Sequence, residues 1–396
     1  MTETEARELD AADELPTLRP EFHVPAEAAY LAGNSLGLQH RSIRDRLLDE
    51  LDDWARLGVE GHLEAKRPWL PYHEQLRVPA ARLVGAAPAE IVMMNSLTVN
   101  LHLMMISFYR PTADRHAIVI EDSSFPSDNY AVRSQAAFHG YDPDAAVIRL
   151  ESGDDVVNFL AAQGDRVALV LLGGVNYLTG ELLDIPAITA AGHVAGAVVG
   201  WDLAHAAGNV PLQLHDWDVD WAAWCTYKYL NSGPGAVAGA FVHERHLADR
   251  SLPRLEGWWG TQAGTRFAMA PVLEPVDTAD AWQLSNPPIL AMAPVLASLE
   301  VFDAIGMAAL RAKSVRLTGY LESLLGGLDV ITPGDPARRG AQLSVRVPDA
   351  AAASRRLREF GVIADSREPD VIPFAPAPLY NTLHDCWRAA EAMRRV

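Results

Sequence analysis

Two ionisable residues, Asp202 and Lys228, each stand at the end of a short apolar run with the composition of a buried strand. The first run covers residues 197–202, and the second covers residues 221–228. A buried lysine can form a Schiff base with pyridoxal phosphate, and a nearby aspartate can pair with the protonated pyridine nitrogen, so that the cofactor becomes an electron sink. A buried aspartate and an unrelated surface lysine would explain this pair equally well in isolation.

Elements that could bring the two residues together extend from about residue 88 to residue 245. Short apolar runs, such as residues 117–120, 167–172 and 197–199, alternate there with amphipathic stretches. Runs that are apolar on both faces and separated by helical patterns predict a parallel sheet covered by helices. Ligands on such α/β sheets bind beyond the carboxyl ends of the strands, where Asp202 and Lys228 would both lie. This convergence favours the pyridoxal phosphate interpretation.

The pattern changes after about residue 285 and predicts a smaller α+β lobe. Residues 289–325 predict one long helix or two, residues 342–347 alternate like a half-exposed strand, and residues 349–360 and 381–395 predict helices. We expect the first fifty residues to pack against this lobe. The predicted division is an N-terminal segment (1–55), a large cofactor-binding domain (56–285) and a small C-terminal domain (286–396).

Composition limits the kinds of partner that we expect for this protein. Among 396 residues, 33 Lys and Arg stand against 51 Asp and Glu, and the net charge of −18 argues against nucleic acid or an anionic membrane as the main partner. The two cysteines, Cys225 and Cys386, offer neither a disulfide framework nor metal-ligand spacing, so we expect no metal site. The acidic start of the chain lacks the apolar segment of a signal peptide, and no uncharged run has the length of a membrane span. We therefore expect a cytoplasmic protein.

Two further motifs could bind such a cofactor. Residues 95–100 open a helical pattern after an apolar run, so the amides of Leu97 and Thr98 and the Thr98 hydroxyl could bind a phosphate. An ordinary helix N-cap is the alternative. After the run that ends at residue 120, Phe125 could stack on the pyridine ring or belong to the core, and Asp128 could support the contact of Asp202.

Along almost its whole length the chain resembles kynureninase, a fold-type-I pyridoxal phosphate enzyme. Separate stretches match in one order along the chain, and the Tyr227–Asn231 segment around the lysine is one of them. The matching stretches are residues 30–38, 61–62, 66–69, 95–103, 125–128, 202–208, 214–217, 227–231, 257–258, 285–289 and 378–381.

The resemblance implies site roles for individual residues. Lys228 would be the Schiff-base lysine and Asp202 the pyridinium partner, and these two would be the catalytic pair. The cofactor-binding residues would be Leu97, Thr98, Phe125, Asp128, Asp202, His205, Tyr227, Lys228, Trp258 and Asn286. The substrate would meet His62, Asn34, Ser35 and Asn286. The resemblance also implies a homodimer in which Trp258 and Asn286 reach the cofactor across the interface.

The family's reaction acts on a small amino-acid substrate. Removal of the Cα proton, hydration of the γ-ketone and cleavage of the Cβ–Cγ bond would release an anthranilate-type product and alanine.

Two positions depart from the family pattern. Gly173 stands where the family has a serine whose hydroxyl assists the phosphate, a loss of about 1 kcal/mol for one neutral hydrogen bond. Pro373 stands where the family has an arginine that binds the substrate α-carboxylate. Without that charge-assisted contact, affinity should fall at least about 10- to 100-fold. The nearby Arg367 matches a different family arginine and is expected to be structural, and Arg338 or Arg339 are further candidates for the missing contact.

Three functions are therefore open. Pro373 favours a diverged relative that performs other Cα or Cβ chemistry in secondary metabolism. That chemistry would be β-elimination or decarboxylation, with or without oxidation, of an amino-acid or cysteine conjugate. The first alternative is a genuine kynureninase with a relocated carboxylate contact, and the second is a pyridoxal phosphate-binding protein without catalysis.

Overall fold

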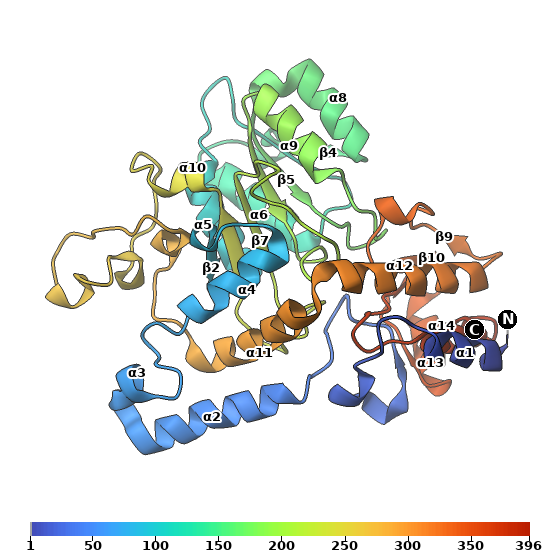
Figure 1. The fold of residues 1–396 in the computed structure, drawn as a ribbon. Helices are drawn as coiled ribbons and strands as arrows, with labels where there is room; N and C mark the ends of the chain where they lie inside the picture. Colours follow the sequence, from blue (N-terminus) through green and yellow to red (C-terminus); the bar gives the residue numbers. More distant parts are fainter. Residues whose placement is uncertain (1) are drawn as a thin grey trace.

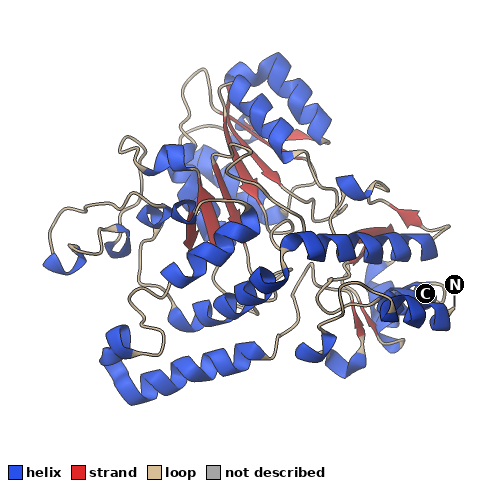
Figure 2. Ribbon diagram, viewed as in Figure 1, coloured by secondary structure: helices blue, strands red, loops and turns tan. Residues whose placement is uncertain are grey.

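The computed structural model describes residues 2–396 and places a seven-stranded sheet at the centre of the larger lobe (Figures 1 and 2). The strand order is β2-β8-β7-β6-β5-β3-β4. The strands are β2 (Ile91–Met93), β3 (Ala117–Glu121), β4 (Val147–Leu150), β5 (Val167–Gly173), β6 (Val198–Asp202), β7 (Trp221–Trp224) and β8 (Gly239–Val242). Strands β4, β3, β5, β6 and β7 are parallel to one another, and β8 is antiparallel to both β7 and β2. The expected α/β fold with a mainly parallel sheet is confirmed.

Helices cover both faces of the sheet, which explains why its strands are apolar on both sides. One hydrophobic cluster joins the sheet to α4 (Glu74–Val84), α8 (Gly153–Gln163), α9 (Ile185–Val194) and α11 (Ile289–Ile305). A second cluster lies on the other face, against α5 (Leu97–Phe108) and α6 (Pro126–Phe138). Both layers are visible around the sheet in Figure 2.

The smaller lobe contains a three-stranded antiparallel sheet in the order β12-β10-β9. Its elements are β9 (Asp329–Val330), β10 (Leu343–Arg346), β12 (Val371–Phe374), α12 (Met307–Leu324), α13 (Ala350–Glu359) and α14 (Leu383–Met393). The start of the chain packs on this lobe. Helix α1 (Glu3–Ala11) lies beside α14 (Figure 1), and β1 (Ala29–Tyr30) pairs in parallel with β11 (Val362–Ile363).

The segment 289–325 forms two helices, α11 and α12, bent by 84° at Gly306, which has a positive φ. Helix α11 packs on α2 (Ser42–Leu57) and α4, beside the large sheet, whereas the hydrophobic cluster of the smaller lobe begins within α12. We therefore propose that the chain passes between the lobes along α12. No single helix among the described residues is long and apolar enough to cross a membrane, and the bent pair α11–α12 meets that criterion by length and composition only.

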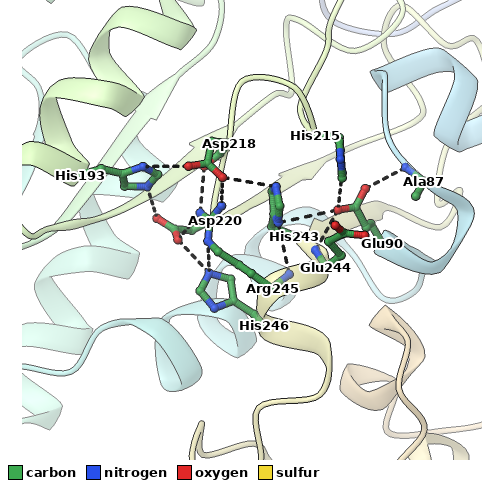
Figure 3. Close-up of polar contacts among 10 residues, drawn as sticks. All are labelled: Ala87, Glu90, His193, His215, Asp218, Asp220, His243, Glu244, Arg245 and His246. Atoms are coloured by element: carbon green, nitrogen blue, oxygen red, sulfur yellow. Dashed lines mark hydrogen bonds and ion pairs between the residues drawn. The ribbon is translucent and has the colours of Figure 1, made fainter.

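A polar network lies at the amino ends of the parallel strands (Figure 3), around the buried carboxylate of Asp220 immediately before β7. This carboxylate accepts a hydrogen bond of 2.7 Å from the Val199 amide. It also pairs with His193 (2.9 Å), His246 (2.8 Å) and Arg245 (2.6 Å). Burial opposes ionisation of Asp220, but the hydrogen bonds from these three side chains hold its pKa far below the ordinary value.

A second buried carboxylate, Glu90, joins neighbouring segments in the same network (Figure 3). One oxygen accepts from the Ala87 amide at 2.7 Å, and the other accepts from the Glu244 amide at 2.8 Å and from His215 Nδ1 at 2.9 Å. The donor atoms of Glu90, His215 and His243 lie within 4.8 Å of one another, a spacing that could hold a metal ion. Both carboxylate oxygens are nevertheless satisfied by hydrogen bonds within the chain, so the cluster has a sufficient structural role as an anchor of this end of the sheet.

Replacing Asp220 tests the network. Asp220→Asn is expected to lower the free energy of unfolding by about 3 kcal/mol at pH 7, because it leaves the partly buried Arg245 guanidinium and two histidine side chains without their carboxylate partner. A carboxylate whose pKa is depressed by folding stabilises the protein above its unfolded-state pKa and ceases to do so as the pH falls. The difference between the variant and the wild type should therefore shrink below about pH 4. Urea unfolding across this pH range measures it.

The matched control is Asp218→Asn. Asp218 belongs to the same network, but its side chain is exposed. Its removal should change the free energy of unfolding by no more than about 1 kcal/mol. Equal effects of the two substitutions would contradict the view that the buried carboxylate holds this edge together.

Candidate active site

A cavity of about 390 Å³ lies where the strands β3, β5 and β6 end, at the opposite edge of the sheet from the network in Figure 3. The amino ends of α5 and α6 and the segment that follows β7 also contribute to its wall. Two residues, Ser35 and Arg367, come from segments attached to the smaller lobe. The lining residues are Ser35, Ser96, Leu97, Thr98, Glu121, Ser124, Phe125, Ser127, Asp128, Gly173, Val175, Asn176, Tyr177, Asp202, Ala204, His205, Tyr227, Lys228 and Arg367.

The predicted pair Asp202 and Lys228 faces this cavity, and Asp202 is supported by a second carboxyl group. Asp202 is the last residue of β6, and its Oδ1 accepts a hydrogen bond of 2.7 Å from the Ala204 amide. Burial raises the pKa of Asp202, and the Ala204 amide and the charge of Lys228 partly oppose this effect. Burial and the negative charge of Asp202 raise the pKa of Asp128, on α6, much further. Burial and mutual repulsion therefore favour one shared proton on this pair, and Asp128 is the residue that protonates more readily.

A third carboxylate, Glu121 at the end of β3, lies in the same wall and was not identified from the sequence. It accepts hydrogen bonds from the Gly173 amide at 2.8 Å and from Asn176 Nδ2 at 2.9 Å. Burial and the charge of Asp202 raise the pKa of Glu121. The strand-end rule that located Asp202 would have found Glu121 as well, since it ends the neighbouring apolar run.

The glycine at position 173 has a structural explanation in this arrangement. A Cβ atom added to Gly173 would lie 3.0 Å from Glu121 Oε2. A serine side chain at this position would crowd the Glu121 carboxylate. The close contact between the Gly173 amide and Glu121 therefore explains why glycine stands here.

Lys228 Nζ lies 3.0 Å from His205 Nε2 and 5.7 Å from the centre of the Phe125 ring. Burial, followed by the charges of Lys228 and Arg367, holds the pKa of His205 well below its ordinary value. The imidazole is therefore neutral, and its Nε2 accepts a hydrogen bond from the lysine. The other ring nitrogen, Nδ1, is buried and has no hydrogen-bond partner among the described residues.

An anion-binding end is formed where the amino ends of α5 and α6 meet. The hydroxyl groups of Thr98 and Ser127, one from each helix, are hydrogen-bonded at 2.7 Å. The N-cap residue Ser96 forms no side-chain capping bond, so the first amides of α5, including those of Leu97 and Thr98, remain available to a ligand. Ser127 was missed as a separate site residue, although it lies inside the matched stretch 125–128.

Phe125 lines the cavity and is 44% exposed, so it does not belong to the hydrophobic core. Its ring meets that of Tyr177 edge-to-face at 5.1 Å. Tyr227 also lines the cavity, beside Lys228. Phe125 therefore presents an exposed aromatic ring to the cavity, with Lys228 Nζ over it.

Four predicted residues do not line the cavity of the single chain. Asn34 is fully buried next to Ser35, and its amide atoms have no hydrogen-bond partner among the described residues. His62 packs edge-to-face on Trp69 at 5.5 Å. Trp258 lines a separate cavity, and Asn286 is exposed. His62 follows α2 on α3 (Gly61–Glu64), which extends away from the large sheet in Figure 1.

The residues present fit pyridoxal phosphate. A buried carboxylate such as Asp202 needs a cationic donor, which a protonated pyridine nitrogen provides. The helix amides and hydroxyls suit a phosphate, and Lys228 suits an aldehyde. Among the described residues, Asp128 Oδ1 and His205 Nδ1 are buried without a hydrogen-bond partner, and both belong to the same wall, where a ligand could contact them.

Known proteins resemble the chain along its whole length. A family model described as the kynureninase C-terminal domain matches residues 310–393. A kynureninase from Salinispora tropica is 67% identical, with 99% of this chain and 96% of the relative covered. A kynureninase from Koribacter versatilis is 53% identical, with 98% and 96% covered.

Solved structures share the fold at much lower sequence identity. The cysteine desulfurase CsdA from Escherichia coli has a TM-score of 0.79 at 18% identity, with 95% of this chain and 96% of that chain covered. A lysine variant of C-DES, which holds glycine linked to its PLP cofactor, has a TM-score of 0.80 at 19% identity, with 95% and 98% covered. The predicted fold-type-I architecture is therefore confirmed.

The pair of carboxyl groups formed by Asp128 and Asp202 leads to a prediction for the stability of the unliganded protein. Asp128→Asn is expected to raise the free energy of unfolding at pH 8 by about 1 kcal/mol, because an amide donates to Asp202 without a second buried ionisable group. A carboxyl whose pKa is raised by folding stabilises the protein below its unfolded-state pKa and loses this effect as the pH rises. The difference in the free energy of unfolding between Asp128→Asn and the wild type should therefore increase as the pH rises above about 4.

Thermal or urea unfolding between pH 4.5 and pH 8 measures this difference. Asp122→Asn, which removes an exposed carboxylate near the same strand end, is the control and should leave stability unchanged. A variant less stable than the wild type at pH 8 would mean that Asp128 is ionised and bonded as an acceptor.

Proposed function

Since the chain belongs to the kynureninase family, we propose that this pyridoxal phosphate-dependent enzyme hydrolyses L-kynurenine or 3-hydroxykynurenine. The products would be anthranilate or 3-hydroxyanthranilate, together with L-alanine. The observation that carries the proposal is the cavity that brings Lys228, Asp202 and the amino end of α5 together. This cavity stands in a chain that is similar to kynureninases over nearly its full length.

The similarity reverses the order of preference that Pro373 suggested. A diverged β-elimination or decarboxylation was favoured from the sequence, because the family's carboxylate-binding arginine is missing. Identity of 67% over 99% of the chain favours the hydrolytic alternative. A non-catalytic role has no support, since the relatives are enzymes and the Lys228–Asp202 pair is intact.

The residues of the chain provide the groups that the reaction needs. Bound pyridoxal phosphate supplies an electron sink for the electron pair left at the substrate Cα. Lys228 Nζ is the base that removes the Cα proton, and the neutral His205 holds it by a 3.0 Å hydrogen bond. Asp202, kept in place by the Ala204 amide and by Asp128, stabilises positive charge at the pyridine nitrogen. The two helix amino ends fix the phosphate, and thereby the orientation of the ring.

Release of anthranilate from L-kynurenine, followed by fluorescence, tests the proposed reaction. Lys228→Ala should lower the rate by at least about 1,000-fold, because it removes both the aldehyde-binding group and the base. The chain has three lysines, and Lys66→Ala is the control because Lys66 is exposed and pairs with Asp49. Borohydride reduction followed by peptide mapping should place the cofactor on Lys228 and on neither Lys66 nor Lys313.

Other products would identify the other reactions. Carbon dioxide, or pyruvate with ammonia and a thiol, formed without anthranilate would contradict the hydrolytic proposal. An unchanged rate in the Lys228→Ala protein would contradict the role of the lysine.

We also propose a homodimer in which each site is completed by its partner. Trp258 and Asn286 lie outside the cavity of their own chain. Trp258 is 40% exposed, on a segment between β8 and α11 that projects from the large lobe (Figure 1). An exposed aromatic residue on a projecting segment is suited to a partner surface.

Mixing two inactive variants tests the shared site. If Trp258 serves the partner's cofactor, Lys228→Ala and Trp258→Ala should each be inactive as homodimers. A mixed dimer then has one site with both intact residues. Refolded or co-expressed mixtures should recover up to about a quarter of wild-type activity, because half of the dimers are mixed and one of their two sites is intact. Recovery should be absent if each site is built from a single chain.

A further inference from the structure

The cavity contains few groups that could hold the α-carboxylate of an amino acid. Its described lining includes three carboxyl groups, those of Glu121, Asp128 and Asp202, and two basic side chains, those of Lys228 and Arg367. Lys228 is required for the cofactor aldehyde and for proton transfer. Arg367 is therefore the cation that is left for an anionic substrate group.

The hydrogen bonds of Arg367 leave one edge of its guanidinium group free. Nη1 donates to the Asp365 carboxylate and to the Ser366 carbonyl. Neither Nε nor Nη2 donates to any described residue, and Nε is buried. These two nitrogens form the side of the guanidinium group that binds a carboxylate through two parallel hydrogen bonds. A buried donor without a partner is unfavourable, and a bound carboxylate would satisfy it.

The backbone fixes the position of this side chain. Arg367 lies between β11 and β12, and its amide and carbonyl are both hydrogen-bonded to Val371, at 2.7 and 2.9 Å. The side chain is 20% exposed. Asp365, which occupies Nη1, also receives a hydrogen bond from Ser35, another residue of the cavity wall. A short hairpin therefore presents a largely pre-organised cation to the cavity.

The charge of Arg367 is felt by the groups around Lys228. It contributes to the lowered pKa of His205, after burial and after Lys228 itself, and His205 Nε2 is 3.0 Å from Lys228 Nζ. It also opposes the burial that raises the pKa of Tyr229. Since the amine and the carboxylate of an α-amino acid share one carbon atom, their binding groups must lie near each other. Arg367 and Lys228 both line the one cavity, which is consistent with this requirement.

The other candidates for this contact are placed elsewhere. Pro373 has no donor, and it does not line the cavity. The exposed Arg338 pairs with Glu181. Arg339 is buried and pairs with Glu322. Neither of these arginines lines the cavity.

We propose that Arg367 binds the α-carboxylate of the substrate through its free Nε–Nη2 edge, in place of the family arginine that is missing at Pro373. This inference rests on the proposed function, because it takes an α-amino acid as the substrate. It extends that function by naming the specificity-determining residue, which the sequence pattern had marked as structural only. The hydrogen bonds to Asp365 and Ser366 give Arg367 its structural role, and the free edge of its guanidinium group gives it the role in carboxylate binding.

The test compares L-kynurenine with its carboxamide, which has no anionic group. In Arg367→Gln, KM for L-kynurenine should rise about 10- to 100-fold while kcat changes less, since a charge-assisted bidentate contact is lost. The affinity of the holoenzyme for the carboxamide, measured by titration of the cofactor absorbance band, should change little. Arg367→Lys keeps the positive charge but lacks the two parallel N–H donors of the guanidinium group, and should give an intermediate KM. Arg338→Gln is the control and should leave KM unchanged.

Two outcomes would overturn the inference. One is an unchanged KM for L-kynurenine in Arg367→Gln. The other is an equal loss of affinity for the acid and the carboxamide, which would indicate a structural role only. If Arg367→Gln fails to fold, Arg367→Lys serves as the test variant. Its affinities for L-kynurenine and for the carboxamide are compared within one protein, so a loss of preference for the acid can still be measured.

Failure of the proposed function is distinguishable from failure of this inference. If the wild type does not cleave L-kynurenine, titration of the wild type and Arg367→Gln with L-alanine still measures carboxylate binding. A roughly 10-fold or larger loss of affinity in the variant supports Arg367 as the carboxylate-binding residue. Equal affinity overturns it.

Discussion

The active cavity is organised by a carboxylate that the fold buries at the end of a strand. Asp202 is buried and faces the cavity, and Asp128 and Glu121 add two more acidic groups at the same edge. Such a cluster is unfavourable unless protons, amides or cations compensate it. The Ala204 amide, the proton on Asp128 and the charge of Lys228 supply part of this compensation, and a cationic ring nitrogen would supply the rest. Binding of a cationic ring would therefore offset part of the free energy that this buried acidic cluster costs.

The sequence predicted the groups that lie at the ends of regular elements. Asp202 and Lys228 follow apolar runs, and Leu97 and Thr98 open a helical pattern, so simple rules about parallel sheets and helix termini brought them together. Arg367 could not be placed in this way. It belongs to a hairpin in the other lobe, and no periodic pattern states where a loop between two short strands will project. His62 and Trp258 show the opposite case. The family resemblance assigned them roles in the site, but the single chain does not place them at the cavity.

The strand that carries Pro373 explains how the family arginine could be lost without damage to the fold. Proline removes a backbone donor, which normally excludes it from the middle of a sheet. Opposite Pro373, however, Ser344 directs its amide to Thr332 Oγ1 at 2.8 Å, and its carbonyl accepts from the Ile331 amide at 2.9 Å. Both groups of Ser344 are therefore occupied on the side of β9, and the β10–β12 ladder needs no N–H from residue 373. A proline at this position therefore removes no hydrogen bond from this ladder.

The place of the arginine determines more than affinity. With pyridoxal phosphate bound, the carboxylate contact would orient the substrate and so help to select which Cα bond breaks. A carboxylate without a partner could itself turn into the breaking position, and decarboxylation would then compete with proton removal. With Lys228 on the large lobe and Arg367 on a hairpin of the smaller lobe, an amino-acid substrate held by both would connect the two lobes. Binding energy from the carboxylate would then fix the orientation of Cα and the relative position of the lobes together. If Arg367 binds the carboxylate, the identity of the reaction would depend on where this cation lies as much as on its charge.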